Sequence, residues 1–137
     1  MQIEIAEGIR SVLIVEDEAL VAMMMEDLVR ELGVQDVHIC SDVDSALQLA
    51  TTADIDCAVL DLMVRGGTSE SVADALAERG VPFVFTTGSD VGAFGDRHAA
   101  RPSIGKPFTD DDFKLVLLDT WALRAPPLGT APPFLTA

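Results

Sequence analysis

The chain has 137 residues and a mass of 14.6 kDa, and its nine Lys and Arg stand against 23 Asp and Glu, which gives a formal net charge of −14. This balance argues against nucleic-acid binding, because affinity for phosphates comes mainly from Lys and Arg. With 49% hydrophobic residues the chain can build the core of one domain, and no apolar run approaches the ~20 residues that span a bilayer. The two cysteines lack metal-ligand spacing and the N-terminus lacks a basic, apolar leader, so we expect a cytoplasmic protein.

Short apolar blocks of strand length alternate along the chain with longer segments of helical period, as in sheets of parallel strands. The strand-length blocks lie at 11–15, 37–40, 57–60, 81–85 and 103–105. Helical segments follow them: one that ends at Gly33, one capped near Ser41 or Asp42, one at 71–79, and one that begins at Thr109 or Asp110. Between 89 and 101, glycines interrupt the pattern, and we expect a short or mobile fourth helix there.

Two helical segments carry apolar residues whose spacing predicts the side that faces the core. These residues are Leu20, Met24, Leu28 and Leu32 in the first segment, and Leu115, Leu118 and Trp121 in the last. The two histidines, His38 and His98, have no ligand partner at useful spacing, so we expect them at the surface or in loops.

Strict alternation of five strands and five helices predicts an α/β fold built on a doubly wound parallel sheet. In such sheets, binding and chemistry take place outside the carboxyl ends of the strands. Five polar residues stand at those ends: Glu16 and Asp17 after the first strand, Asp61 after the third, Thr87 after the fourth and Lys106 after the fifth.

Three carboxylates that converge repel one another, so they either take up protons or bind a hard divalent cation, of which Mg²⁺ is the natural one. Such an ion leaves positions for a phosphoryl group, whose other oxygens the Thr87 hydroxyl and the Lys106 ammonium can contact. Asp61 is then a candidate nucleophile for phosphoryl transfer. Taken one at a time, these residues could also be helix-start, turn or cap residues, but their joint occurrence at four strand ends favours a site.

The segments that contain these residues are Val15-Glu16-Asp17-Glu18, Leu60-Asp61-Leu62, Phe85-Thr86-Thr87-Gly88 and Lys106-Pro107-Phe108. In order and spacing over residues 11–123, they resemble the receiver domain of two-component response regulators. The resemblance implies a flavodoxin-like sheet of strand order 2-1-3-4-5. It also implies a cis peptide bond before Pro107.

The same resemblance assigns roles to the residues at the strand ends. Asp61 is the implied phosphoacceptor, and Thr87 and Lys106 are the implied contacts of the phosphoryl group. The implied ligands of Mg²⁺ are Glu16, Asp17, Asp61 and the backbone carbonyl of Met63.

The stretch Phe85-Thr86-Thr87-Gly88 is similar to the Phe-Ala-Thr-Gly motif of atypical single-domain regulators of alphaproteobacteria. Regulators of that group work with HWE-type sensor histidine kinases, and they lack the aromatic residue three positions before the lysine, where this chain has Ser103. The chain departs from the group at Thr86, which replaces the alanine, and at Met63, which replaces a polar residue and bears on dephosphorylation. Without a ring at Ser103, any switch must use other parts, and 89–101 is the expected one.

We expect three parts: an N-terminal extension at 1–9, a receiver domain at 10–123 and a Pro-rich tail at 124–137, which is too short for an output domain. The leading hypothesis is a signalling protein rather than an enzyme. It accepts a phosphoryl group on Asp61 from a sensor histidine kinase, and then contacts a downstream protein or acts as a phosphate sink. The alternative is a receiver-fold adaptor that binds partners without phosphorylation. A hydrolase would need an aspartate at the position of Met63.

Overall fold

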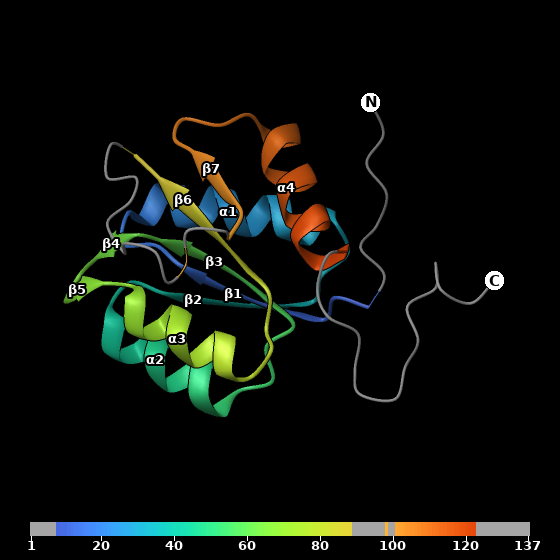
Figure 1. The fold of residues 1–137 in the computed structure, drawn as a ribbon. Coiled ribbons are helices and arrows are strands. Elements are labelled where there is room, and N and C mark those ends of the chain that lie inside the picture. The colour runs from blue at the N-terminus through green and yellow to red at the C-terminus, as the bar shows by residue number, and fades with distance from the viewer. Residues whose placement is uncertain (1–7, 89–97, 99–100, 123–137) are drawn as a thin grey trace.

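The computed structural model describes residues 8–88, 98 and 101–122. Its strands are β1 (Ser11–Val15), β2 (Asp36–Cys40), β3 (Cys57–Asp61), β4 (Met63–Val64), β5 (Gly67–Thr68), β6 (Phe83–Thr87) and β7 (Ser103–Gly105), and its helices are α1 (Ala19–Glu31), α2 (Val43–Thr52), α3 (Glu70–Glu78) and α4 (Asp110–Ala122). One sheet holds β2, β1, β3, β6 and β7 in that order, and every neighbouring pair is parallel. Counted over these five strands the order is 2-1-3-4-5, which confirms the predicted flavodoxin-like fold (Figure 1).

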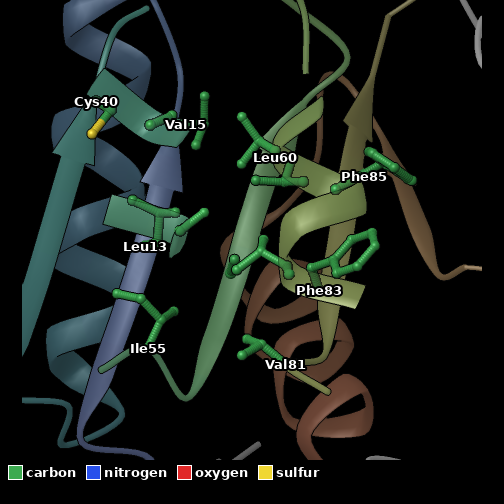
Figure 2. Close-up of a cluster of buried hydrophobic side chains, with 14 of the residues drawn as sticks. Leu13, Val15, Cys40, Ile55, Leu60, Val81, Phe83 and Phe85 are labelled. Atoms are coloured by element: carbon green, nitrogen blue, oxygen red, sulfur yellow. The ribbon is translucent and has the colours of Figure 1, made fainter. Parts of the chain in front are cut away.

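Helices cover both faces of this sheet: α2 and α3 lie on one face, and α1 and α4 lie on the other (Figure 1). The strands β1, β3 and β6 are buried along their whole length, because they run between the two helical layers. Figure 2 shows the half of the core under α2 and α3, to which Leu13, Leu60 and Phe83 contribute from three neighbouring strands. In the other half, Met25 and Phe113 pack α1 and α4 against the opposite face.

Two helices begin at residues whose side chains cap them. The Asp42 carboxylate accepts a hydrogen bond from the Ser45 N–H at 2.7 Å at the start of α2. At the start of α4, the Thr109 hydroxyl accepts one from the Asp112 N–H at 3.1 Å. Each bond satisfies an N–H that has no partner inside its helix, so two of the predicted helix starts are confirmed.

The buried face of α1 differs from the predicted one. Leu20 is 82% exposed and Met24 is 39% exposed, although the spacing predicts both in the core. The buried residues of the helix are Ala22, Met25, Leu28 and Val29. A step of four residues turns a helix by about 400°, which is about 40° more than a full turn. Residues spaced only by fours therefore rotate progressively away from the buried side. Alternating steps of three and four residues stay on it.

The buried face of α4 also differs, because apolar and polar residues are both spread around this helix and spacing alone does not select a side. Leu115 is 39% exposed, and Leu118 and Trp121 are only partly buried. The buried residues are Phe113, Leu117 and Thr120. The buried residues are therefore offset from the predicted ones by one or two positions along the helix.

The two leucines of α4 should respond differently to truncation. Leu117→Ala should lower the free energy of unfolding by about 2–5 kcal/mol, because it leaves a cavity between α4 and the sheet. Leu115→Ala should lower it by less than about 1 kcal/mol, since that side chain keeps much of its contact with water. Urea unfolding followed by circular dichroism measures both values. Equal losses in the two variants would contradict this assignment of the buried face.

Two features of the described chain were not predicted. The strands β4 and β5 form a small antiparallel hairpin directly after β3. Its turn contains Gly66, whose φ of +94° favours glycine, and the Arg65 carbonyl ties it to the start of α2 by accepting the Val43 N–H at 3.0 Å. The second feature is the burial of His98, which lies in a turn, within the surface-or-loop expectation, but is only 7% exposed.

Four helices lie in the part of the chain that the structure describes, against five predicted. The remaining one is expected at 89–101, and nearly all of that range lies outside the described residues. The extension at 1–9, apart from its last two residues, and the tail at 124–137 also lie outside them. Among the helices described, none has the length and apolar character needed to cross a membrane.

Candidate functional site

The strand ends bring the predicted site residues to one edge of the sheet. Glu16 and Asp17 follow β1, and Asp61 is the last residue of β3. Thr87 is the last residue of β6, and it pairs with Gly105, the last residue of β7. The backbone continues this pairing for one more step, because the Lys106 N–H donates to the Thr87 carbonyl at 2.7 Å. The register of the sheet therefore places all five residues at its carboxyl edge.

Three carboxylates form an acidic cluster at this edge. One oxygen each from Glu16, Asp17 and Asp61 lies within 4.8 Å of the others. Glu16 is 1% exposed and Asp61 is 8% exposed, whereas Asp17 is partly exposed. Oxygen ligands at this spacing suit a hard divalent cation, so the cluster fits a Mg²⁺ site.

The Lys106 ammonium neutralises part of this charge. Its Nζ donates to Glu16 Oε1 at 2.7 Å and to Asp61 Oδ2 at 3.1 Å, so one cation bridges two of the three carboxylates. The second oxygen of Glu16 accepts the Glu18 N–H at 3.1 Å, which fixes the carboxylate at the start of α1. The Lys106–Pro107 peptide bond is cis, as the family resemblance implied.

These contacts set the charge state of the site. Burial raises the pKa of the Asp61 carboxyl to about 6; the hydrogen bond from Lys106 opposes this rise, and the negative charge of Glu16 adds to it. Burial by itself would lower the pKa of the Lys106 ammonium, but its hydrogen bonds to Glu16 and Asp61 outweigh that effect, and the pKa is raised. At neutral pH the site therefore holds a protonated lysine beside a mostly ionised Asp61.

Ionisation of Asp61 should reduce the stability of the metal-free protein. Its pKa is about 6 in the folded chain against an ordinary value of 3.8, so its contribution to stability is complete at low pH and is lost as the pH rises through 6. Between about pH 4 and about pH 7.5, the wild type should lose about 2–3 kcal/mol relative to Asp61→Asn. Urea unfolding in EDTA measures this difference. Parallel pH profiles for the two proteins would contradict the prediction.

The hairpin after β3 determines how the Met63 backbone is presented. Met63 pairs with Thr68, and the flanking Ser69 N–H donates to the Leu62 carbonyl at 3.0 Å. In an antiparallel ladder hydrogen-bonded and non-hydrogen-bonded pairs alternate, so Met63 and Thr68 form a non-hydrogen-bonded pair. The hairpin ladder therefore does not use the Met63 carbonyl, which can serve as a ligand. Met63 as a whole residue is 48% exposed.

Sequence reasoning missed a second group of residues around β6. His98 Nε2 lies 2.8 Å from Asp74 Oδ1, and the Arg101 guanidinium stacks on the Phe83 ring at 4.4 Å. No spacing in the sequence connects His98 with Asp74, which lies 24 residues earlier on α3. Only the packing of His98 against α3 in the folded chain brings them together.

A family model described as the response regulator receiver domain matches residues 12–118. The chain belongs to this family. Receiver domains are signalling domains of two-component systems rather than typical enzymes, and they interact with histidine kinases. A comparison with curated proteins finds no match.

Solved structures show the same relationship. SdrG from Sphingomonas melonis Fr1 is 42% identical, with a TM-score of 0.67, and the match covers 80% of this chain and 96% of that one. The receiver domain of the PhyR response regulator from Erythrobacter litoralis is 29% identical, with a TM-score of 0.77 and coverage of 92% and 98%. The receiver domain of the sensor histidine kinase PA1611 from Pseudomonas aeruginosa PAO1, whose crystal structure has a magnesium ion in the active-site cleft, shares the fold at 22% identity, with a TM-score of 0.70 over 83% of this chain and 98% of that one.

Proposed function

We propose that this receiver accepts a phosphoryl group on Asp61 from a phosphohistidine of a sensor histidine kinase, in a Mg²⁺-dependent reaction. The observation that carries the proposal is the charge arrangement at the sheet edge. Three carboxylates lie within 4.8 Å of one another, and Lys106 contacts two of them. Such a site can bind a divalent cation and a phosphoryl group together, because the cation offsets the negative charge of the carboxylates and of the phosphoryl oxygens.

The proposed metal ligands are Glu16, Asp17, Asp61 and the backbone carbonyl of Met63. The donor set fits Mg²⁺, since all four atoms are oxygens and the Met63 carbonyl is not used by its hairpin. When bound, the ion neutralises charge on the phosphoryl oxygens as the group is transferred. The magnesium ion in the PA1611 receiver supports this assignment by analogy of fold.

In the proposed reaction an Asp61 carboxylate oxygen attacks the phosphorus of the phosphohistidine. The new O–P bond forms while the P–N bond breaks, and its electron pair stays on the imidazole nitrogen. The imidazole leaves neutral, because its other nitrogen carries a proton. Lys106 already donates to Asp61 and has three N–H groups, so it can follow the charge onto a phosphoryl oxygen. Thr87 supplies a hydroxyl donor from the end of β6, and catalysis is mostly positioning and charge neutralisation.

Several further assignments belong to the same proposal. The phosphorylated receiver at 10–123, flanked by an extension at 1–9 and a Pro-rich tail at 124–137, signals by contact with a downstream protein or acts as a phosphate sink. Its kinase is of the HWE type, which the resemblance carried by the Phe85–Gly88 motif supports. A cytoplasmic location accords with the two cysteines, which are both buried and lie in separate strands.

Acetyl phosphate tests the proposal without knowledge of the kinase. Incubated with this donor and Mg²⁺, the wild-type protein should gain the mass of one phosphoryl group, and hydroxylamine should remove it because acyl phosphates react with that nucleophile. EDTA should prevent the gain. An unchanged mass in Mg²⁺, with the protein folded, would contradict the proposal and favour the adaptor alternative, in which partners bind without phosphorylation.

A further inference from the structure

A polar pair packed against β6 takes no part in the proposed chemistry. His98 Nε2 lies 2.8 Å from Asp74 Oδ1 on α3, and the His98 side chain is 5% exposed. The His98 ring meets the rings of Phe83 and Phe85 edge-on, with centroid distances of 5.7 Å and 6.1 Å. His98 is therefore held to α3 and to two residues of β6.

The contacts continue from His98 into the start of β7. The Arg101 N–H donates to the His98 carbonyl at 3.0 Å, and the Arg101 guanidinium carbon lies 4.4 Å from the centre of the Phe83 ring. The Pro102 carbonyl then accepts the Phe85 N–H at 3.0 Å, which joins this segment to the β6–β7 ladder. The start of β7 is thus held against β6 through His98 and Arg101.

Lys106 directly follows the other end of β7. The strand has three residues, and among the described strands its single neighbour in the sheet is β6, so its ladder hydrogen bonds are made with β6. Directly after it, the Lys106 N–H donates to the Thr87 carbonyl at 2.7 Å, and Lys106 Nζ reaches Glu16 and Asp61. A strand this short spans about 10 Å, so a displacement at its start is transmitted to Lys106.

We propose that His98 is a positioning residue for Lys106. Through its hydrogen bond to Asp74, it sets the position of β7 and hence the position of the Lys106 ammonium against Asp61. The inference rests on the proposed function, in which Lys106 contacts the phosphoryl group. It assigns to α3 and His98 an influence on a site with which neither has a direct hydrogen bond in the described residues.

Mg²⁺ binding without any phosphodonor gives the first test. The Lys106 ammonium repels a cation bound at Asp61, so His98→Phe, which keeps a ring but loses the bond to Asp74, should tighten Mg²⁺ binding about threefold. Asp74→Ala and Lys106→Met should act in the same direction. His98→Gln, whose amide can still donate to Asp74, should stay close to wild type. Titration followed by NMR measures each dissociation constant, and Glu78→Gln, an exposed change on α3, is the matched control.

Two further readouts separate positioning from a general loss of structure. At saturating Mg²⁺, His98→Phe should slow labelling by acetyl phosphate about tenfold while Mg²⁺ binds more tightly, whereas a loosened fold would weaken both. The double variant His98→Phe/Lys106→Met should bind Mg²⁺ no more tightly than Lys106→Met alone. Unchanged Mg²⁺ affinity in both His98→Phe and Asp74→Ala, or full additivity with Lys106→Met, would overturn the inference. A wild type that binds Mg²⁺ but is never phosphorylated would refute the proposed function. The Mg²⁺ affinities of the single and double variants would still decide whether His98 positions Lys106.

Discussion

Asp61→Asn should abolish covalent phosphorylation of the receiver, with a fall in labelling rate of at least about 1000-fold. An amide oxygen lacks the charge that makes the carboxylate a nucleophile, although it can still accept the hydrogen bond that Lys106 now donates at 3.1 Å. Intact-mass measurement after incubation with acetyl phosphate and Mg²⁺ gives the rate. Because the variant should be more stable than wild type at neutral pH, its inactivity cannot come from unfolding.

The matched control is Asp27→Asn, the same chemical change at an exposed position of α1. It should be labelled at the wild-type rate, because it lies outside the acidic cluster. Peptide mapping of the labelled wild type should place the phosphoryl group on the segment that contains Asp61. Undiminished labelling of Asp61→Asn would remove Asp61 as the acceptor and leave the proposed mechanism without its nucleophile.

Lys106→Met should have the second largest effect, because it removes the cation that faces two buried carboxylates but keeps most of the apolar stem. Without Mg²⁺, the free energy of unfolding should fall by about 2–4 kcal/mol, since the fully buried Glu16 side chain loses its partner at 2.7 Å. Labelling by acetyl phosphate should slow by about 100-fold, because one donor to the transferred group is gone. Added Mg²⁺ should restore part of the stability by binding the same carboxylates in the folded state.

Lys114→Met is the control for this charge removal. Lys114 Nζ lies 3.0 Å from Glu31 Oε1, but the Glu31 side chain is 58% exposed, so water can replace the lost contact. Its loss should be below about 1 kcal/mol, and its labelling rate should equal that of wild type. Urea unfolding with and without Mg²⁺ measures the stabilities. Equal losses of the free energy of unfolding in the two variants would show that the burial of Glu16 does not determine the size of the loss.

Comparison of the two helices that cover one face of the sheet shows where sequence reasoning reached its limit. For α1, the spacing of Leu20 and Met24 predicts a core stripe, yet both are exposed and Met25 is buried. A run of apolar residues offers several stripes about 20–40° apart, and the docking angle of the helix on the sheet selects one of them. The same reason explains why Leu117, and not Leu115, is buried in α4.

The prediction of the residues at the sheet edge depended far less on which face of each helix is buried. Glu16, Asp17, Asp61, Thr87 and Lys106 converge because the carboxyl ends of parallel strands meet at one edge, whatever the rotation of the covering helices. The order of these residues along the chain and the lengths of the apolar blocks were therefore enough to predict that the five residues converge. Their distances, their burial and the bridge from Lys106 to Glu16 and Asp61 are set by the tertiary structure.

The sequence by itself thus determined the α/β class, the strand order through its family resemblance, and the residues at the strand ends. These features follow from short-range pattern and from the directionality of parallel strands. Only the tertiary structure decided that Met63 lies in a hairpin and that His98 is buried against Phe83 and Phe85 beside Asp74. Such contacts join residues far apart in sequence and depend on packing, for which local periodicity carries no signal.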